Sequence, residues 1–151
     1  MKNQLPNKSL YEEDFYLWVK TTAKQLRERN INQLDWQHLI EEIEALGNEQ
    51  RHKVESYTKQ LLIHLLLYKY WEQERANCGK GWQNEIANFR DELELLLDSK
   101  TLYNYWQQKF DKIYPKARKR VLLKTELPSE IIPLTSPFTL EEVLNEDYLP
   151  E

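Results

Sequence analysis

Three carboxylates stand within four positions of the chain, at Glu41, Glu42 and Glu44. Carboxylates grouped in this way can bind a metal ion or act as general acid and base. Helical bundles that hold two metals usually add a histidine three residues after a glutamate, and no histidine follows these glutamates at that spacing. We expect a solvated helix face favoured by the helix dipole, with a buried salt bridge and a metal or catalytic site as the alternatives.

His64 lies inside an apolar run, on what helical periodicity makes the inward face of a helix. A neutral imidazole buried there needs a hydrogen-bond partner, so we expect a satisfied core histidine. The alternative is a general base or ligand beside Glu44 and Asp35. The other two histidines lie elsewhere on the helix, so we expect no metal site and no cofactor.

Arg90 lies near the inward edge of another predicted helix, among apolar residues. Its guanidinium group is a rigid fork suited to binding a carboxylate. We predict that it pairs with Glu41, Glu42 or Glu44. Together with Asp35 and His64 these residues form the candidate functional or structural cluster.

A basic segment near residue 115 contains seven cations and a single carboxylate: Lys109, Lys112, Lys116, Arg118, Lys119, Arg120 and Lys124, with Asp111. Interleaved tyrosines make this pattern suitable for contacts with nucleic-acid phosphates and bases. The overall pI of 5.5 argues against a dedicated nucleic-acid binder. We expect a solvated face or a docking surface for the acidic tail, and a combined hypothesis is that the tail masks the basic helix.

Charge is distributed unevenly along the 151 residues, whose net charge is −4. Residues 51–124 carry fifteen Lys and Arg against nine Asp and Glu, whereas residues 125–151 carry seven acids and no base. No apolar run approaches the ~20 residues of a membrane-spanning helix. The lone Cys78 cannot form an intramolecular disulfide. We therefore expect a cytoplasmic protein without membrane insertion.

Helical periodicity predicts four main helices that would position these residues. The first begins at Ser9, whose spacing to Glu12 is that of a capping box. The second has Asp35 as its N-cap, and its apolar residues keep one phase well beyond Gly47. We expect one long helix there, with a bend at Gly47 left open.

The glycines of 77–81 predict a turn after this helix. Helix three then runs from about residue 82 to 97 and helix four from about residue 102 to 124. Pro115 should kink helix four or end its first part, because proline lacks an N–H and clashes with the preceding turn.

The fold class that follows is all-α, a bundle of about four main helices with an extended acidic C-terminal tail. Four prolines exclude a long helix in the tail, and the capping-box spacing at Thr139 predicts one short helix there. We expect a single helical domain over residues 1–151. Its parts are a flexible N-terminus at 1–8, the bundle at 9–124, and the Pro-rich tail at 125–151 packed on the bundle.

Several segments together resemble a known family: 11–18, 34–35 with 39–47, 64–66, Gly81-Trp82 with Ile86 and Arg90, 137–140 and 148–150. The family is the bacterial one catalogued as domain of unknown function 29, and the resemblance extends from about Leu10 to Pro150. It implies an all-α fold and carries no assigned activity.

The preferred function is a non-enzymatic interaction or regulatory module of a bacterial cytoplasm, with a protein partner or a second copy bound to it. The first alternative is a nucleic-acid-associated protein that uses the basic helix 109–124. The second alternative is a metal-binding or hydrolytic helical bundle that uses Glu41, Glu44 and His64.

Overall fold

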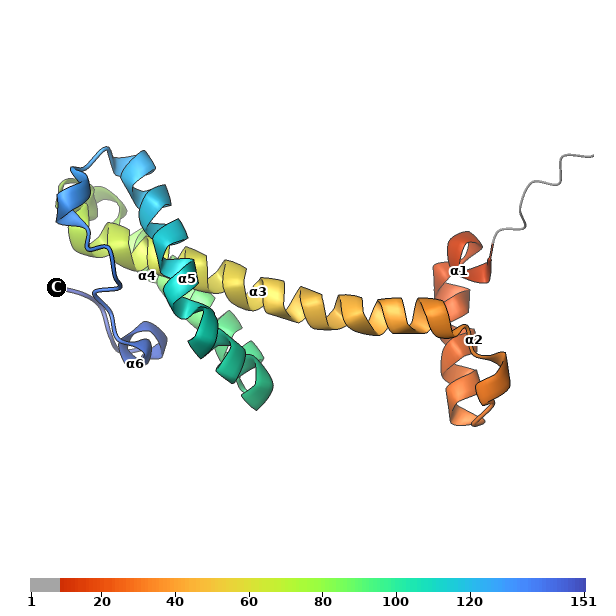
Figure 1. Cartoon of the computed structure of the whole chain (residues 1–151). Coiled ribbons are helices and arrows are strands. Elements are labelled where there is room, and N and C mark those ends of the chain that lie inside the picture. Colours follow the sequence, from red (N-terminus) through yellow and green to blue (C-terminus); the bar gives the residue numbers. More distant parts are fainter. Residues whose placement is uncertain (1–8) are drawn as a thin grey trace, which may run out of the picture. The chain divides into compact units, whose positions relative to one another are not determined.

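The computed structural model describes residues 9–151, and the flexible N-terminus predicted for residues 1–8 lies outside them. Every regular element in this range is helical (Figure 1), which confirms the all-α fold class. Four helices are long: α2 (Phe15–Arg27), α3 (Trp36–Tyr70), α4 (Glu72–Leu97) and α5 (Lys100–Thr125). The shorter elements are α1 (Leu10–Glu13), α6 (Leu140–Leu144) and the 3₁₀ helices η1 (Ile31–Gln33) and η2 (Ser129–Ile131).

Contacts between residues divide the chain into two compact units, Met1–Asn48 and Glu49–Glu151. Each unit is described by itself below. The single domain predicted over residues 1–151 stays a prediction. In the described part of the chain, no helix is long and apolar enough to cross a membrane.

The first unit begins with two helices where the sequence predicted one. Ser9 precedes α1 but makes no capping hydrogen bond with its side chain. Asp14 interrupts the helix and caps α2, because its carboxylate accepts a hydrogen bond from the Leu17 N–H at 3.0 Å. A side-chain cap on the backbone of the next turn is a strong local start signal, so the predicted capping box at Ser9 is wrong.

Helix α3 continues through Gly47 without a break. A methyl group added at Gly47 would meet no atom within 4 Å. The residue is therefore not needed for close contact with another helix. The apolar periodicity that favoured one long helix was the correct signal.

The turn predicted at the glycines of 77–81 is wrong, because α4 already begins at Glu72 and runs through both glycines. The chain turns at Trp71 instead. There Arg75 donates hydrogen bonds to the Tyr68 carbonyl at 2.7 Å and the Lys69 carbonyl at 3.0 Å. These bonds satisfy two of the carbonyls that the C-terminus of α3 leaves without partners.

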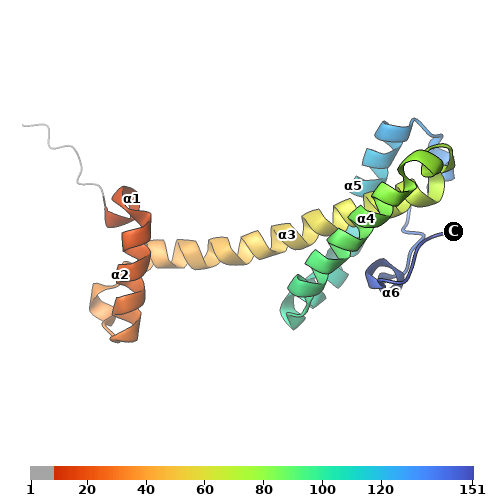
Figure 2. The same cartoon turned by 180° about the vertical axis from the view of Figure 1, so that it is seen from behind.

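The core of the second unit joins α3, α4, α5 and the tail in one apolar cluster, and Figure 2 shows these helices together with α6 of the tail. Its largest fully buried side chains include Trp106, Tyr114 and the leucines of the 61–67 run. Helix α5 does not end at Pro115, as the sequence had allowed, but continues through it. Neighbouring buried residues pack both turns around the proline into this core.

The C-terminal tail packs on the helices of the second unit through both backbone carbonyls and apolar side chains. Tyr114 donates to the Pro133 carbonyl at 2.7 Å, and Arg118 donates to the carbonyls of Ile132 at 2.9 Å and Ser129 at 2.7 Å. Thr139 caps α6 through the Glu142 N–H, as its capping-box spacing predicted. Ile132, Phe138 and Val143 are buried in the core.

Two tyrosines, one in α5 and one in the tail, make the stability of this unit sensitive to alkaline pH. Burial raises the pKa of Tyr114 to about 12. Burial, followed by a hydrogen bond with Glu142, raises the pKa of Tyr148 to about 12. Phenols of the unfolded chain ionise near pH ~10, so between about pH 10 and 12 the unfolded state loses protons that the folded state keeps.

Below about pH 10, these two groups should therefore not make the free energy of unfolding depend on pH. Between about pH 10 and 12, they should make it fall. Urea denaturation at stepped pH measures this decline. Tyr114→Phe should make the decline shallower, because it removes one of the two groups. An equal slope in the variant and the parent protein would contradict the assignment.

Candidate functional site

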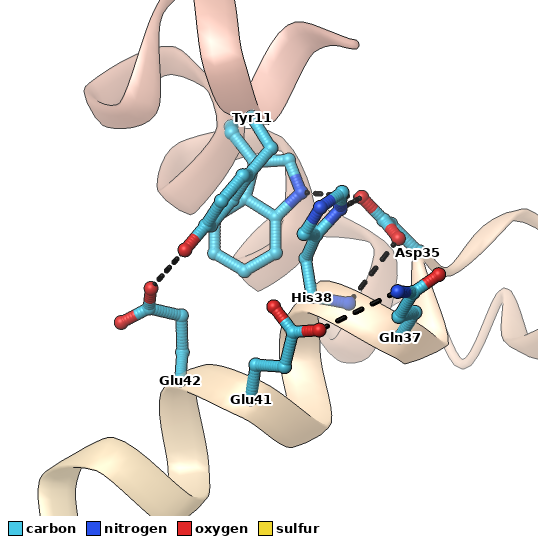
Figure 3. Close-up of polar contacts among 7 residues, drawn as sticks. Tyr11, Asp35, Gln37, His38, Glu41 and Glu42 are labelled. Atoms are coloured by element: carbon cyan, nitrogen blue, oxygen red, sulfur yellow. Dashed lines mark hydrogen bonds and ion pairs between the residues drawn. The ribbon is translucent and has the colours of Figure 1, made fainter.

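Asp35 is the centre of a polar cluster in the first unit, formed with Tyr11, Trp18, His38 and Glu42 (Figure 3). Its carboxylate accepts hydrogen bonds from the Trp18 Nε1–H at 3.1 Å and from the His38 Nδ1–H at 2.6 Å. It also accepts the His38 backbone N–H at 3.4 Å, the bond expected of the predicted N-cap. The hydrogen bond from the His38 ring is the main cause that lowers the pKa of Asp35.

Tyr11 closes the cluster from α1. Its ring stacks on the His38 ring at a centroid distance of 3.9 Å. Its hydroxyl donates a hydrogen bond to the Glu42 carboxylate, and this bond is the main cause that raises the pKa of Tyr11. Figure 3 shows the two residues pointing toward one another from α1 and α3.

An imidazole oriented by a carboxylate can act as a general base. In this cluster, however, the Tyr11 ring covers one face of the imidazole, and Asp35 also holds Trp18 and the start of α3. The bonds thus fasten α1 and α2 to α3. Sequence reasoning named Asp35 and Glu42 but missed the other three residues. The available signal was a histidine three positions after a capping aspartate.

The remaining acids of the predicted cluster do not converge. Glu41 accepts a hydrogen bond from the Gln37 side chain one turn earlier, at 3.4 Å, and Glu44 is exposed. Among residues 9–151, no group of three or more His, Cys, Asp and Glu side chains is arranged to hold a metal ion. The solvated helix face that the sequence favoured describes Glu41 and Glu44 best.

His64 belongs to the second unit, where it lies half-buried on α3. Its Nδ1–H donates to the Gln60 carbonyl at 2.7 Å, and its ring packs against Phe89 at a centroid distance of 5.6 Å. The imidazole thus has its partner within its own helix. Glu44 and Asp35, beside which the alternative interpretation placed His64 as a general base or ligand, belong to the other unit.

Arg90 is buried in α4, and its predicted pairing with Glu41, Glu42 or Glu44 is wrong. All three of its guanidinium nitrogens donate to backbone carbonyls of the tail. Nε binds the carbonyl of Val143 at 2.9 Å, Nη1 that of Tyr148 at 2.8 Å, and Nη2 that of Glu142 at 3.1 Å. Burial lowers the pKa of Arg90. Carbonyl oxygens, which carry no net charge, therefore take the place of the expected carboxylate.

An apolar groove of about 360 Å³ lies between α2 and the start of α3, within the first unit. It is lined by Phe15, Trp18, Val19, Thr22, Ala23, Leu26, Leu39, Glu42, Ile43 and Leu46. Only Trp18 and Thr22 of these are buried, and Ile43 and Leu46 are each 59% exposed. Periodicity predicted these two apolar faces, but their incomplete burial could be seen only in the structure.

A basic hollow of about 370 Å³ lies in the second unit and is lined by Lys59, Lys116, Lys119, Arg120 and Leu123. Three of its cations come from the predicted basic helix and one from α3. None of the lining residues belongs to the tail. Within residues 9–151 the salt bridges are those of Asp35 with His38 and of Glu49 with Lys53, so the predicted masking of the basic helix by tail carboxylates is not observed there.

The other predicted phosphate-binding residues have different surroundings. Lys112 and Lys124 are exposed on α5, and Lys109 lies over the Tyr105 ring at 5.8 Å from its centroid. Arg118 is taken up by the tail carbonyls. Sequence reasoning missed Lys59, because α3 and α5 are distant along the chain.

The chain matches a family model described as "Domain of unknown function DUF29" over residues 10–149. No curated protein and no solved structure matches it.

Proposed function

The chain belongs to the family of domain of unknown function DUF29, and we propose that this protein is a non-enzymatic interaction module of the bacterial cytoplasm that pairs with a second copy of itself. The contact surface is the apolar groove of the first unit. The observation that carries the proposal is the exposure of two apolar helix faces, one on α2 and one on α3, that meet at this groove.

The exposed apolar surface at the groove is large for a monomer. Six apolar side chains in and beside it are each between 41% and 59% exposed: Phe15, Val19, Leu26, Ile40, Ile43 and Leu46. Together they present on the order of 600 Å², at the upper limit of the largest apolar patch on an ordinary monomer. A standard interface buries ~800 Å² on each partner, so a dimer centred on this patch has the expected size.

Charge complementarity identifies a second copy as the occupant. Helix α2 carries Lys20, Lys24 and Arg27 and no acid, whereas residues 36–48, the part of α3 in the first unit, carry three glutamates and no lysine or arginine. No salt bridge within residues 9–151 joins the two sets. In a two-fold dimer every contact between the two copies occurs twice. Helix α2 of each copy can therefore face α3 of the other copy, and the two helices carry opposite charges.

The polar cluster around Asp35 supports a structural role beside this surface. Its hydrogen bonds connect α1, α2 and α3, and its members Trp18 and Glu42 also line the groove, so the bonds hold the two apolar faces at a fixed spacing. A preorganised surface loses less conformational entropy when it binds.

Ile43→Glu tests the proposal, because it places a charge at the centre of the groove. Sedimentation velocity of the full chain should show a dimer for the parent protein. In the variant the dissociation constant should be at least ~100-fold higher, which corresponds to about 2.7 kcal/mol. Leu95→Glu is the matched control, since Leu95 is 78% exposed on α4, outside the groove, and should leave the dimer intact.

A charge exchange tests the orientation of the two copies. By helical periodicity, Lys20 and Arg27 flank the apolar face of α2, and Glu44 flanks that of α3. Lys20→Glu with Arg27→Glu should weaken the dimer, and so should Glu44→Lys alone. A mixture of the two variants should form heterodimers, because both contacts between the copies then join opposite charges. A parent protein that stays monomeric at ~100 µM would refute the proposed function.

A further inference from the structure

We propose that the second unit binds the phosphate backbone of nucleic acid along a basic stripe formed by α3 and α5. The basic hollow is the centre of this stripe. Four cations from two helices converge on it, Lys59 from α3 and Lys116, Lys119 and Arg120 from α5. No carboxylate is among the lining residues.

The convergence of these cations has an electrostatic consequence. Like charges gathered in one hollow repel one another and destabilise the folded state slightly, but they concentrate anions from solution. Neither salt bridge within residues 9–151 involves any of the four. The hollow therefore gathers four cations with no carboxylate among its lining residues, and the ligand class that fits it is anionic.

The stripe extends the hollow in the direction of the N-termini of both helices. Arg51 of α3 lies over the Tyr105 ring at 4.8 Å from its centroid, and Lys109 of α5 lies over the same ring at 5.8 Å. Arg51 and Lys59 are two helical turns apart on α3. Tyr105 and Arg120 are fifteen residues apart on α5, which corresponds to about 22 Å at the helical rise of ~1.5 Å per residue.

A stripe of this length fits a linear polyanion better than a single phosphate. Lys112, exposed on α5 between Lys109 and Lys116, fills the interval. Tyr105 itself is half-buried, and burial is the main cause that raises its pKa. It is therefore not a free platform for base stacking. The recognition expected is of phosphates by charge, which is independent of base sequence and depends strongly on salt.

The position of the tail agrees with this assignment. Arg118 is directed to the carbonyls of Ser129 and Ile132, and no tail residue lines the hollow. The α5 cations that form the stripe are thus different side chains from Arg118, the α5 residue that holds the tail. Binding of a nucleic acid does not require the tail to leave.

The test uses the full chain with a fluorescein-labelled 20-nucleotide RNA, measured by fluorescence anisotropy between 50 and 200 mM salt. Lys116→Gln with Lys119→Gln should weaken binding at least tenfold. Each phosphate contact contributes about 0.7 to the slope of log affinity against log salt for a single strand, so the slope should fall by about 1.4. Lys80→Gln with Lys100→Gln removes equal charge from exposed sites on α4 and α5 and should change neither.

Three other results would each overturn the proposal. The first is an equal loss in the control variant, which would indicate general attraction without a site. The second is binding to vesicles with phosphatidylserine but not to RNA or a DNA duplex. The third is no binding of the parent protein to RNA or DNA at 50 mM salt. Because all four substituted lysines are exposed, circular dichroism should show the same helical content in every variant.

Discussion

Arg90→Met is expected to release residues 142–148 from α4 and to lower the free energy of unfolding by about 4 kcal/mol. The variant leaves three carbonyl oxygens without their charged donor. If each hydrogen bond to a charged group contributes roughly 1.5 kcal/mol net, the sum approaches that figure. Methionine fills much of the volume but donates no hydrogen bond. The loss of stability should therefore come from the three missing hydrogen bonds, with little contribution from a cavity.

Two measurements separate this effect from general destabilisation. Urea denaturation gives the change in free energy of unfolding, and hydrogen exchange gives the opening of the tail. In Arg90→Met, amides around Val143 and Tyr148 should exchange much faster at urea concentrations where the α3 core is still protected. The free energy of unfolding and the tail exchange rates of Arg90→Lys should lie between those of the parent protein and Arg90→Met, because one ammonium group cannot reach three carbonyls in fixed directions. Equal stability and equal exchange in Arg90→Met would contradict the proposed role.

Trp106→Ala is expected to destabilise the second unit by about 3–5 kcal/mol, the usual cost of removing a large buried aromatic side chain. Trp106 is fully buried in the core cluster, where its ring meets Tyr103 and Phe110 at centroid distances of 5.7 Å. Phe110 and Tyr114 of the same helix are buried as well, so the space around Trp106 is densely packed. The surrounding helices cannot collapse fully into the space that an alanine leaves.

Trp106→Phe gives the matched comparison, because the buried Trp106 Nε1–H has no hydrogen-bond partner among residues 9–151. An unpaired buried donor costs about 1–3 kcal/mol. Phenylalanine removes this donor while keeping an aromatic ring, so part of its packing loss is offset. We expect a change within about 1.5 kcal/mol of the parent protein. Thermal unfolding followed by circular dichroism measures both changes. Equal destabilisation by Trp106→Ala and Trp106→Phe would contradict this account.

The all-helical fold followed from local patterns, which is why it could be predicted well. Apolar periodicity showed α3 as one long helix, and the spacing at Thr139 predicted α6. Local signals failed where two of them competed. Asp14 is a stronger cap than Ser9, and the Gly79-Lys80-Gly81 segment stays helical because packing outweighs the low helix propensity of glycine.

For the candidate site, the sequence predicted some of the residues that take part but not which partners they bind. Arg90 was correctly placed on an inward face, but its partners are backbone carbonyls, which every residue carries and which leave no mark in a sequence. Asp35 was correctly identified as a cap, yet its bond to Trp18 depends on how α2 meets α3. The division of the predicted cluster between two units likewise depends on contacts between residues distant along the chain.

The sequence was sufficient to predict the helical fold class, the position of the long helix, the acidic tail and the basic segment of α5, because each is encoded by neighbours one or two helical turns apart. The tertiary structure alone decided which faces remain uncovered at the groove, which carbonyls Arg90 binds, and that Lys59 joins Lys116, Lys119 and Arg120. These features arise where helices cross. Burial and pairing at such crossings depend on which helices pack against each other and at what angle. Helical periodicity predicts which face of a helix is apolar, but not which helix packs against it.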